Sequence, residues 1–340
     1  MINIFAPSES HTFLQEIIDQ EDRLSELVRI VDFLEQRPSA SAHTLIIKNG
    51  EIAFPIDWYN IQPPFILPEF VDLNAANLLG LIFASLDNYE KAYAHLHKSN
   101  PSLFKELDFI NRLKQGISID PGELLSQYSH FEEYRLMHNQ AIVGYYGATT
   151  ESFDPDKTAY FFSEAFQNAP TDDHQAFTAM HFALFLIDLG QQENALRLLE
   201  DSLNLELSSD AKTGLIYTQC QAWLSQLQIP YDQQLLEKLK TNLWEVLQSY
   251  ELQHRDRETA LLLIDAGIIA NYSESWSESL GYYNRAIDLF EKENLPELAA
   301  NAQYRKGILL FTWAKQGNPQ FFRVAAETFQ KAVRVFTLAE

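Results

Sequence analysis

Histidines are the side chains of this sequence that could most readily bind a metal ion. His95 and His97 lie two residues apart on a predicted helix, so they point to different faces and cannot share one ion. His174 and His181 are seven residues apart, or two helical turns, which is too far for a single ion to bridge them. The sequence therefore predicts no metal site, and we interpret these histidines as surface or hydrogen-bonded core residues.

Cys220 and the acidic clusters also lack the surroundings that chemistry would need. Cys220 is the single cysteine, which excludes an intramolecular disulfide and any multi-cysteine metal site. No His or basic residue next to it in the sequence would activate the thiol, so we interpret it as a small buried apolar residue. The acidic clusters at 19–22 and 154–156 lack the Gly and final Glu of a calcium loop and are interpreted as solvated surface.

Motifs of catalytic and nucleotide-binding proteins are missing as well. The sequence contains no phosphate-binding loop, no dinucleotide-binding glycine pattern, no nucleophile elbow and no zinc-binding His-Glu-x-x-His helix. Its 12 glycines leave little material for a loop whose backbone amides would hold a phosphate. We predict no catalytic residue and no cofactor, and we interpret the protein as non-enzymatic; an enzyme with a grafted site is the third alternative.

The charge of the sequence bears on its partners. Among 340 residues, 47 are Asp or Glu and 25 are Lys or Arg, a formal net charge of −22, and the pI is near 4.7. Apolar residues make up 46%, enough for a buried core, so the chain is predicted to be folded. The negative charge repels phosphate backbones and anionic lipids. We therefore expect protein or peptide partners that are basic or neutral, no nucleic acid and no membrane.

The location in the cell is predicted from what the sequence lacks. Residues 2–10 contain no Lys or Arg, so the basic start of a secretory signal is missing. The longest apolar stretch, 260–270, has 11 residues and includes Asp265, which is too short and too polar to span a membrane. The single cysteine agrees with a reducing compartment. We predict a cytoplasmic protein.

Glycine and proline together number only 25 residues, which predicts a mostly helical chain with few coded turns. One stretch, 77–96, has a pattern typical of two short antiparallel helices. Gly80 is followed by an aromatic residue three positions later, Phe83, and by a small residue twelve positions later, Ala92. We predict that the two helices touch at Gly80 and Ala92, because side chains there must be absent or very small.

The same landmarks recur along the chain. The second match comprises Phe182, Ala183, Leu186, Gly190, Ala195, Leu199 and Ser202; the third Ala266, Gly267, Ser279, Tyr283 and Ala286; the fourth Gly307, Ala325, Phe329 and Ala332, with six extra residues around Gly317. A further pair has its first helix near 134–146 and the last landmarks Phe162, Ala165 and Pro170 in its second. Two amphipathic helices between 211 and 250, split at Pro230, are included by position.

These landmarks resemble the tetratricopeptide repeat (TPR) family over residues 72–340. The resemblance implies an all-α fold, a right-handed superhelical solenoid of antiparallel helix pairs. It also implies that the concave face is lined mainly by the first helix of each pair.

Residues 1–71 differ from the repeats and are predicted to form a small N-terminal cap. A helical region is predicted near 9–36, and a β-hairpin over 44–54, because Asn49-Gly50 between β-rich flanks is a strong hairpin signal. Prolines 55, 63, 64 and 68 then space Trp58, Tyr59 and Phe65 in a segment predicted to be extended. The domains are therefore expected to be 1–71 and 72–340.

The family's groove positions, carried over residue by residue, predict a partner-binding concave face. Its residues are Asn77, Leu81, Ser85, Met180, Leu184, Asp188, Ile264, Ile268, Asn271, Asn301, Tyr304, Ile308 and Phe311, with Arg305 nearby. This lining is mainly apolar and lacks the several Lys and Arg with which some family members hold acidic C-terminal peptides. It favours an amphipathic helix or an apolar peptide. Alternatively, these residues only pack against neighbouring helices or are covered by the N-terminal segment.

The last predicted helix, 319–338, is apolar on more than one side. Phe322, Ala325, Phe329, Ala332 and Phe336 share a face that should meet the partner helix, whereas Phe321, Val324, Val335 and Leu338 fall elsewhere. Solenoids usually end in a polar capping helix. Either this edge, represented by Phe321, Val335 and Leu338, associates with another molecule such as a second copy in a homodimer, or the chain is cut from something longer.

The sequence thus favours a protein–protein interaction scaffold that binds a partner helix or peptide in the groove. The alternative is a ligand-switched regulator, in which a peptide or small molecule in the groove changes the pitch of the superhelix.

Overall fold

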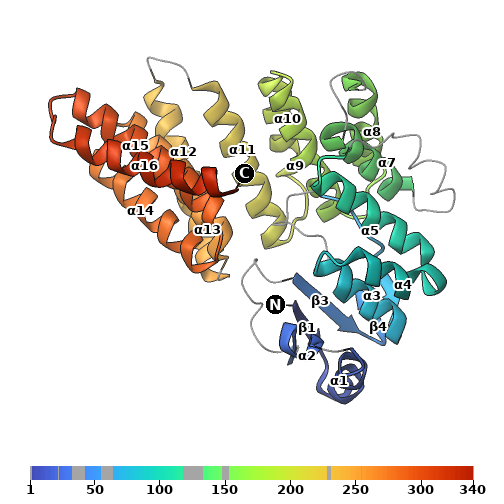
Figure 1. Cartoon of the computed structure of the whole chain (residues 1–340). Helices are drawn as coiled ribbons and strands as arrows, with labels where there is room; N and C mark the ends of the chain where they lie inside the picture. The colour runs from blue at the N-terminus through green and yellow to red at the C-terminus, as the bar shows by residue number, and fades with distance from the viewer. Residues whose placement is uncertain are drawn as a thin grey trace. The chain divides into compact units, whose positions relative to one another are not determined.

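The computed structural model describes residues 2–21, 23–32, 43–54, 64–117, 133–147, 153–227, 231–253 and 255–339. The chain divides into two compact units, which are considered separately: the first extends to Leu215 and the second begins at Ile216, within helix α11 (Ser209–Gln226) (Figure 1).

A five-stranded sheet forms the N-terminal part of the first unit. Its strands are β1 (Ile2–Ala6), β2 (Val28–Asp32), β3 (His43–Lys48), β4 (Glu51–Ala53) and β5 (Phe70–Asp72), in the order β2-β1-β3-β4-β5. β1 is parallel to β2 and β3, and the other two pairs are antiparallel. Asn49 and Gly50 turn β3 into β4 with φ of 55° and 81°, as a type I′ turn requires, which confirms the predicted hairpin.

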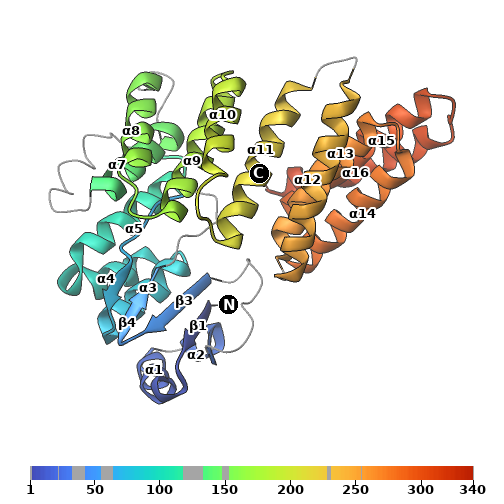
Figure 2. The same cartoon turned by 180° about the vertical axis from the view of Figure 1, so that it is seen from behind.

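One face of this sheet is part of the main core. The register places Ile4 opposite Leu45, and Ile52 opposite both Ile47 and Val71, so all five side chains point to the same face. They share a core cluster with apolar residues of α1 (His11–Ile18), and Figure 2 shows α1 beside the strands. The same cluster includes buried residues of the first helix pair, α3 (Ala75–Ser85) and α4 (Tyr89–Ser99). The cap and the first repeat are therefore one packed body.

The helix predicted near 9–36 is shorter than expected. The chain forms α1, the short α2 (Leu24–Leu27) and then β2, where helix was predicted. Val28, Ile30 and Val31 are β-branched, and pairing with β1 satisfies their backbone groups. Strands β1 and β5 were not predicted either. Residues 33–36, Trp58 and Tyr59 lie outside the described residues, and residues 64–68 are neither helix nor strand.

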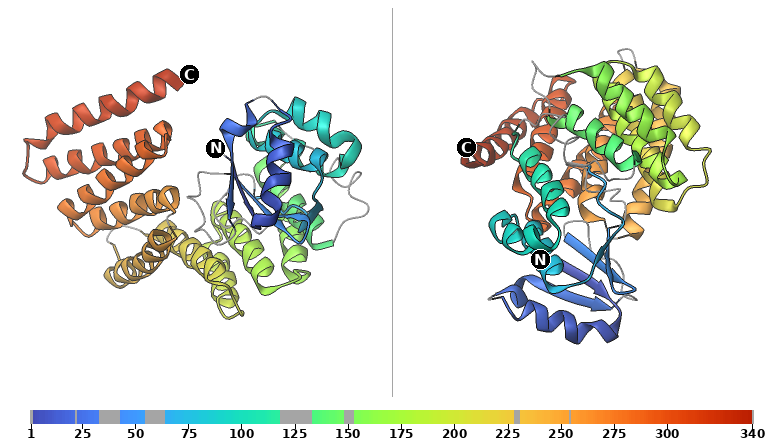
Figure 3. Two further views of the ribbon diagram at one scale, coloured as in Figure 1. Left: turned by 90° about the horizontal axis from the view of Figure 1, so that it is seen from below. Right: turned by 90° about the vertical axis from the view of Figure 1, so that its right-hand side faces the viewer.

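The remaining described chain is almost entirely helical, and its helices follow one another in antiparallel pairs. After α3 and α4 come α5 (Pro101–Lys114), α7 (Glu133–Ile142) with a π-helical turn (Val143–Gly147), α8 (Pro155–Gln167), α9 (Asp172–Asp188), α10 (Gln192–Ser202), α11, α12 (Gln233–Leu252), α13 (Asp256–Tyr272), α14 (Trp276–Lys292), α15 (Pro296–Lys315) and α16 (Phe321–Ala339). The predicted pairs are confirmed. In the second unit, α13 to α16 pack each against the next, and Figure 3 (left) shows them side by side in one row.

The helices of a pair touch where the sequence places its glycine. A Cβ atom added at Gly267 would lie 2.7 Å from Tyr283 Cε1, and one added at Gly307 would lie 2.6 Å from Phe329 Cε1. Gly80 faces Leu96 in the same way, and Ala92 is fully buried. The second helix therefore packs directly on the backbone of the first.

The small position twelve residues after the glycine has a role of its own in the α13–α14 pair. There Ser279 is fully buried, and its hydroxyl donates a hydrogen bond of 2.7 Å to the carbonyl of Gly267. This bond satisfies a polar atom that burial would otherwise leave without a partner.

The α7–α8 pair has a corresponding contact that the sequence did not reveal. Gly144, in the π-helical turn, faces Thr158, with the added Cβ 2.5 Å from Oγ1. The longer connection between the two helices shifted the spacing and hid this landmark.

We predict that Gly267→Ala destabilises the second unit by about 1–3 kcal/mol, because the new methyl group would overlap the buried Tyr283 ring. Gly281 in α14 is the matched control, since a Cβ added there meets nothing within 4 Å. Gly281→Ala should leave stability unchanged or raise it by up to about 1 kcal/mol through helix propensity. Urea unfolding followed by circular dichroism measures both, and equal effects of the two variants would show that the close approach is not a constraint.

Candidate interaction surfaces

The groove residues predicted on α3 and α9 are mostly not accessible. Asn77, Leu81 and Met180 are buried, and Asn77 Nδ2 donates a 2.9 Å hydrogen bond to the carbonyl of Asp72. Ser85 and Leu184 are half-buried. Asp188 is exposed, and its carboxylate accepts a hydrogen bond from the Tyr145 hydroxyl. In the first unit, therefore, these positions offer little free apolar surface.

The predicted positions on α13 and α15 are more open. Ile264, Ile268 and Asn271 of α13 are half-buried, as is Ile308 of α15. The exposed members lie on α15: Asn301, Tyr304, Arg305 and Phe311. Asn301, Tyr304, Ile308 and Phe311 follow one another at steps of three or four residues and so share one face of the helix, with Arg305 beside them. In the second unit, four of the predicted positions are thus exposed, all on α15.

A half-buried carboxylate, that of Asp265, lies beside this face. The Tyr217 hydroxyl of α11 donates a hydrogen bond of 2.8 Å to Asp265 Oδ2 of α13. Burial raises the pKa of Asp265 to about 6, while this hydrogen bond and the charge of Arg305 on α15 act in the opposite direction. Residues of three successive first helices therefore interact electrostatically.

The raised pKa of Asp265 predicts a pH-dependent stability of the second unit. Because the unfolded carboxyl ionises near its ordinary pKa of 3.8, the stabilisation is complete below about pH 4 and is lost as the pH rises through 6. Asp265→Asn should remove this loss, on the order of 2 kcal/mol, and flatten the stability curve between pH 4 and 7. Asp288→Asn, at an exposed position of α14, is the control in the same urea titrations. Parallel curves for the wild type and Asp265→Asn would contradict the assignment.

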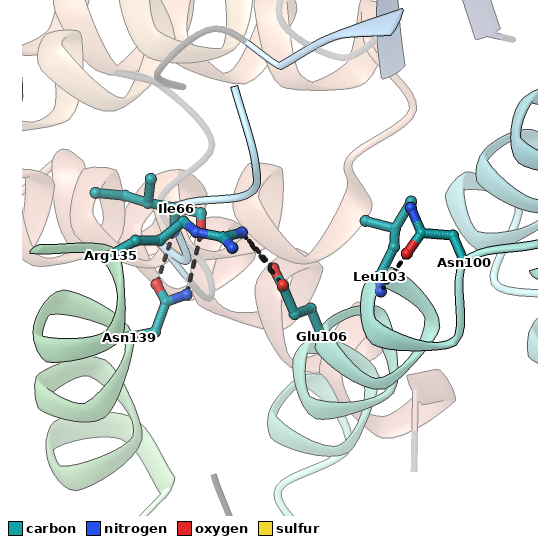
Figure 4. Close-up of polar contacts among 6 residues, drawn as sticks. All are labelled: Ile66, Asn100, Leu103, Glu106, Arg135 and Asn139. Atoms are coloured by element: carbon teal, nitrogen blue, oxygen red, sulfur yellow. Dashed lines mark hydrogen bonds and ion pairs between the residues drawn. The ribbon is translucent and has the colours of Figure 1, made fainter. Parts of the chain in front are cut away.

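A row of buried polar side chains on α7 holds an extended part of the N-terminal segment. Asn139 Oδ1 accepts a 2.8 Å hydrogen bond from the amide of Ile66, and its Nδ2 donates one of 3.0 Å to the Ile66 carbonyl (Figure 4). His138 Nε2 lies 2.9 Å from the Pro64 carbonyl and therefore donates to it. Burial lowers the pKa of His138 to about 4, so the ring is neutral at pH 7. The chain's own segment thus covers the first helix of this pair.

The sequence of α7 carries a signal for this arrangement. Residues 134–140 read Tyr-Arg-Leu-Met-His-Asn-Gln, an unusually polar run for a helix that the repeat pattern places in the interior. Buried polar groups need partners, so such a run predicts a partner segment nearby.

A buried ion pair joins α5 to α7 (Figure 4). Arg135 Nη1 lies 3.2 and 3.1 Å from the two carboxylate oxygens of Glu106, and both residues are buried. Burial raises the pKa of Glu106 to about 7, and the Arg135 charge opposes this. Asn100 caps α5 by accepting a 3.1 Å hydrogen bond from the Leu103 amide. These contacts fix α5 against the helix that binds segment 64–66.

We predict that Arg135→Met destabilises the first unit by about 3–5 kcal/mol at pH 8, because it leaves the Glu106 carboxylate buried without its cation. The loss should shrink at pH 5, where Glu106 is protonated. Lys91→Met is the control, since it removes an exposed ion pair with Glu21 at 2.9 Å and should cost less than about 1 kcal/mol. Thermal unfolding at both pH values measures this; a loss independent of pH would contradict the burial of a charge.

On α16, the exposed apolar residues are not those predicted for the edge. Phe321 is half-buried and stacks on Trp313 of α15 with 4.3 Å between ring centroids; Val335 is half-buried as well. The side chain of Leu338 lies outside the described ones. Phe322 and Phe336, predicted to meet the partner helix, are 43% and 44% exposed. The small Ala325 and Ala332 make the close approach to α15 and leave the larger rings at its border.

Among the described residues, no three His, Cys, Asp or Glu side chains are grouped to hold a metal ion. Within the same part of the chain, every helix is too short or too polar to cross a membrane.

Comparison with known proteins extends these observations. No protein-family model and no curated protein matches the sequence. The solved structures that resemble the fold include MamA from Desulfovibrio magneticus RS-1, from residue 41 onward, and a STAND signal transduction ATPase with a tetratricopeptide repeat sensor from Pyrococcus horikoshii.

The two likenesses differ in extent. The MamA match has 13% identity and a TM-score of 0.43, and covers 62% of this chain and 98% of the other. The STAND match has 12% identity and a TM-score of 0.50, and covers 77% of this chain but only 41% of the other. The fold is therefore a TPR-like helical array with a small N-terminal cap.

Proposed function

We propose that this protein is a non-enzymatic interaction scaffold that binds a helix or peptide of a partner on the first-helix face of its second unit. The observation that carries the proposal is the exposure of Tyr304 and Phe311, at 49% and 45%, on the predicted face of α15. Large exposed aromatic side chains on one helix face are typical of protein-binding sites.

The face continues onto the preceding pair. Ile268 of α13 and Ile308 of α15 are forty residues apart, as are Gly267 and Gly307, so they occupy the same position in successive pairs. Both are half-buried, so part of each side chain is open to a partner; the two positions are called the Ile268–Ile308 row. The excess of acidic residues outside the last helix pair favours a basic or neutral partner beside Ile268, on α13.

A ligand-switched regulator is the second candidate. It is favoured by the Tyr217–Asp265 contact and the charge of Arg305, which link three first helices and would respond to a ligand that alters their spacing. The sensor in the name of the Pyrococcus structure agrees with such a role.

The scaffold proposal predicts that Ile268→Glu with Ile308→Glu abolishes binding of specific partners. Proteins captured by the wild-type chain would be quantified against those captured by this variant and by Leu252→Ser, which changes an 82% exposed residue of α12. The control should retain the wild-type set, and circular dichroism should show that all three proteins are folded. Recovery of the same set by the groove variant would contradict the proposal.

A further inference from the structure

An aromatic surface lies across the last helix pair and shares the exposed rings of α15 with the face of the proposed function. It consists of Tyr304 and Phe311 of α15 with Phe322, Phe329 and Phe336 of α16, here called the terminal aromatic face. Phe311 packs on Phe322 with 5.7 Å between ring centroids, and Tyr304 packs on Phe329 with 5.6 Å. All but the half-buried Phe329 are 43–49% exposed. Because Tyr304 and Phe311, and likewise Phe322, Phe329 and Phe336, are seven residues apart, the rings lie along one side of each helix.

The preceding helix pair shows what such a surface accommodates. Tyr283 and Phe329 both pack on the glycine of their pair, so a residue of α14 corresponds to the residue 46 positions later in α16. By this register Phe290 corresponds to Phe336, yet Phe290 is fully buried. Trp276 corresponds to Phe322, and the Trp276 ring stacks on Trp313 of α15 with 6.3 Å between ring centroids. In the preceding pair, this face is thus covered by the next helix.

The charge around the terminal aromatic face differs from that of the rest of the chain. Residues 296–339 contain six Lys or Arg and two Glu, a net charge of +4, whereas the other 296 residues contain 19 basic and 45 acidic ones, a net charge of −26. Five of the six basic side chains are exposed: Arg305, Lys315, Arg323, Lys331 and Arg334. The Lys315 ammonium lies 5.5 Å from the centroid of the Phe311 ring. A partner would meet aromatic rings flanked by positive charge.

These observations define the chemistry of the occupant. A second copy joined through the same face would place +4 against +4, which opposes such a dimer. A helix with one apolar stripe and acidic flanks satisfies both the shape and the charge. We propose that the terminal aromatic face binds an acidic amphipathic helix of another protein, seated as α15 is seated on α13 and α14. This inference rests in part on the proposed function, because Tyr304 and Phe311 belong to both faces; the variants at Phe322 and Phe336 and at Ile268 and Ile308 separate the two.

The test uses two fluorescein-labelled helical peptides, each about 20 residues long, with leucines at positions i, i+3, i+4 and i+7. One peptide carries glutamates at its other positions and the second carries lysines. Fluorescence anisotropy with the full chain should show binding of the glutamate peptide, weakened as salt shortens the Debye length below about 8 Å. The lysine peptide should bind at least tenfold more weakly.

Two variants locate the binding. The double variant Phe322→Ser with Phe336→Ser should lower the affinity for the glutamate peptide at least tenfold. Trp244→Ser, at a 55% exposed residue of α12, should leave this affinity unchanged. Lys315→Glu with Arg334→Glu alters only exposed charges, brings the net charge of residues 296–339 from +4 to 0, and should abolish the preference between the peptides. This charge variant remains informative even where the aromatic variant fails to fold.

Several results would overturn the inference. Equal affinity for both peptides, or no loss in either double variant, would show that neither the rings nor the charges recognise the helix. Absence of glutamate-peptide binding would overturn it too. If binding increased when the protein was diluted, a second copy that dissociates on dilution would be the occupant of the face. Loss of binding in Ile268→Glu with Ile308→Glu alone would assign the peptide to the first-helix row instead.

Discussion

The contact that the rest of this structure depends on is the approach of one helix to the bare backbone of its partner. At Gly267 and Gly307 an aromatic ring lies where a Cβ atom would otherwise be, and Leu96 does the same at Gly80. Because the helices of a pair come this close, each pair is a flat unit that presents one face to the preceding pair and one to the next. Stacking of such units buries a continuous core with few glycine or proline turns.

The binding surfaces follow from that geometry. Trp276 of α14 stacks on Trp313 of α15, whereas Phe322, the corresponding residue of α16, is exposed. In the first unit, segment 64–66 lies on α7, where its backbone pairs with Asn139. The fold therefore offers helix faces that accept either another helix or an extended chain.

Part of this could be predicted from the sequence. The helix pairs and the Asn49-Gly50 hairpin have local signals: a fixed spacing of small residues and a turn that needs positive φ. Strands β1 and β2 have no such local signal, because they are stabilised by pairing with each other although they lie far apart in the sequence. The exposure of individual residues on α16 could not be predicted either. Phe321, which was predicted to be exposed, is half-buried because its ring stacks on Trp313 of α15. The overall charge of −22 hid the positive last pair, because an average carries no information on position.

We propose that the exposed helix faces of the second unit bind a different protein and not a second copy of the chain. The mass of the purified chain in solution, measured by light scattering after size exclusion, tests this most directly. The account predicts about 39 kDa at every protein concentration, the mass of one chain. A mass near twice that value, returning to a single chain when Phe336 is changed to Ser, would contradict it.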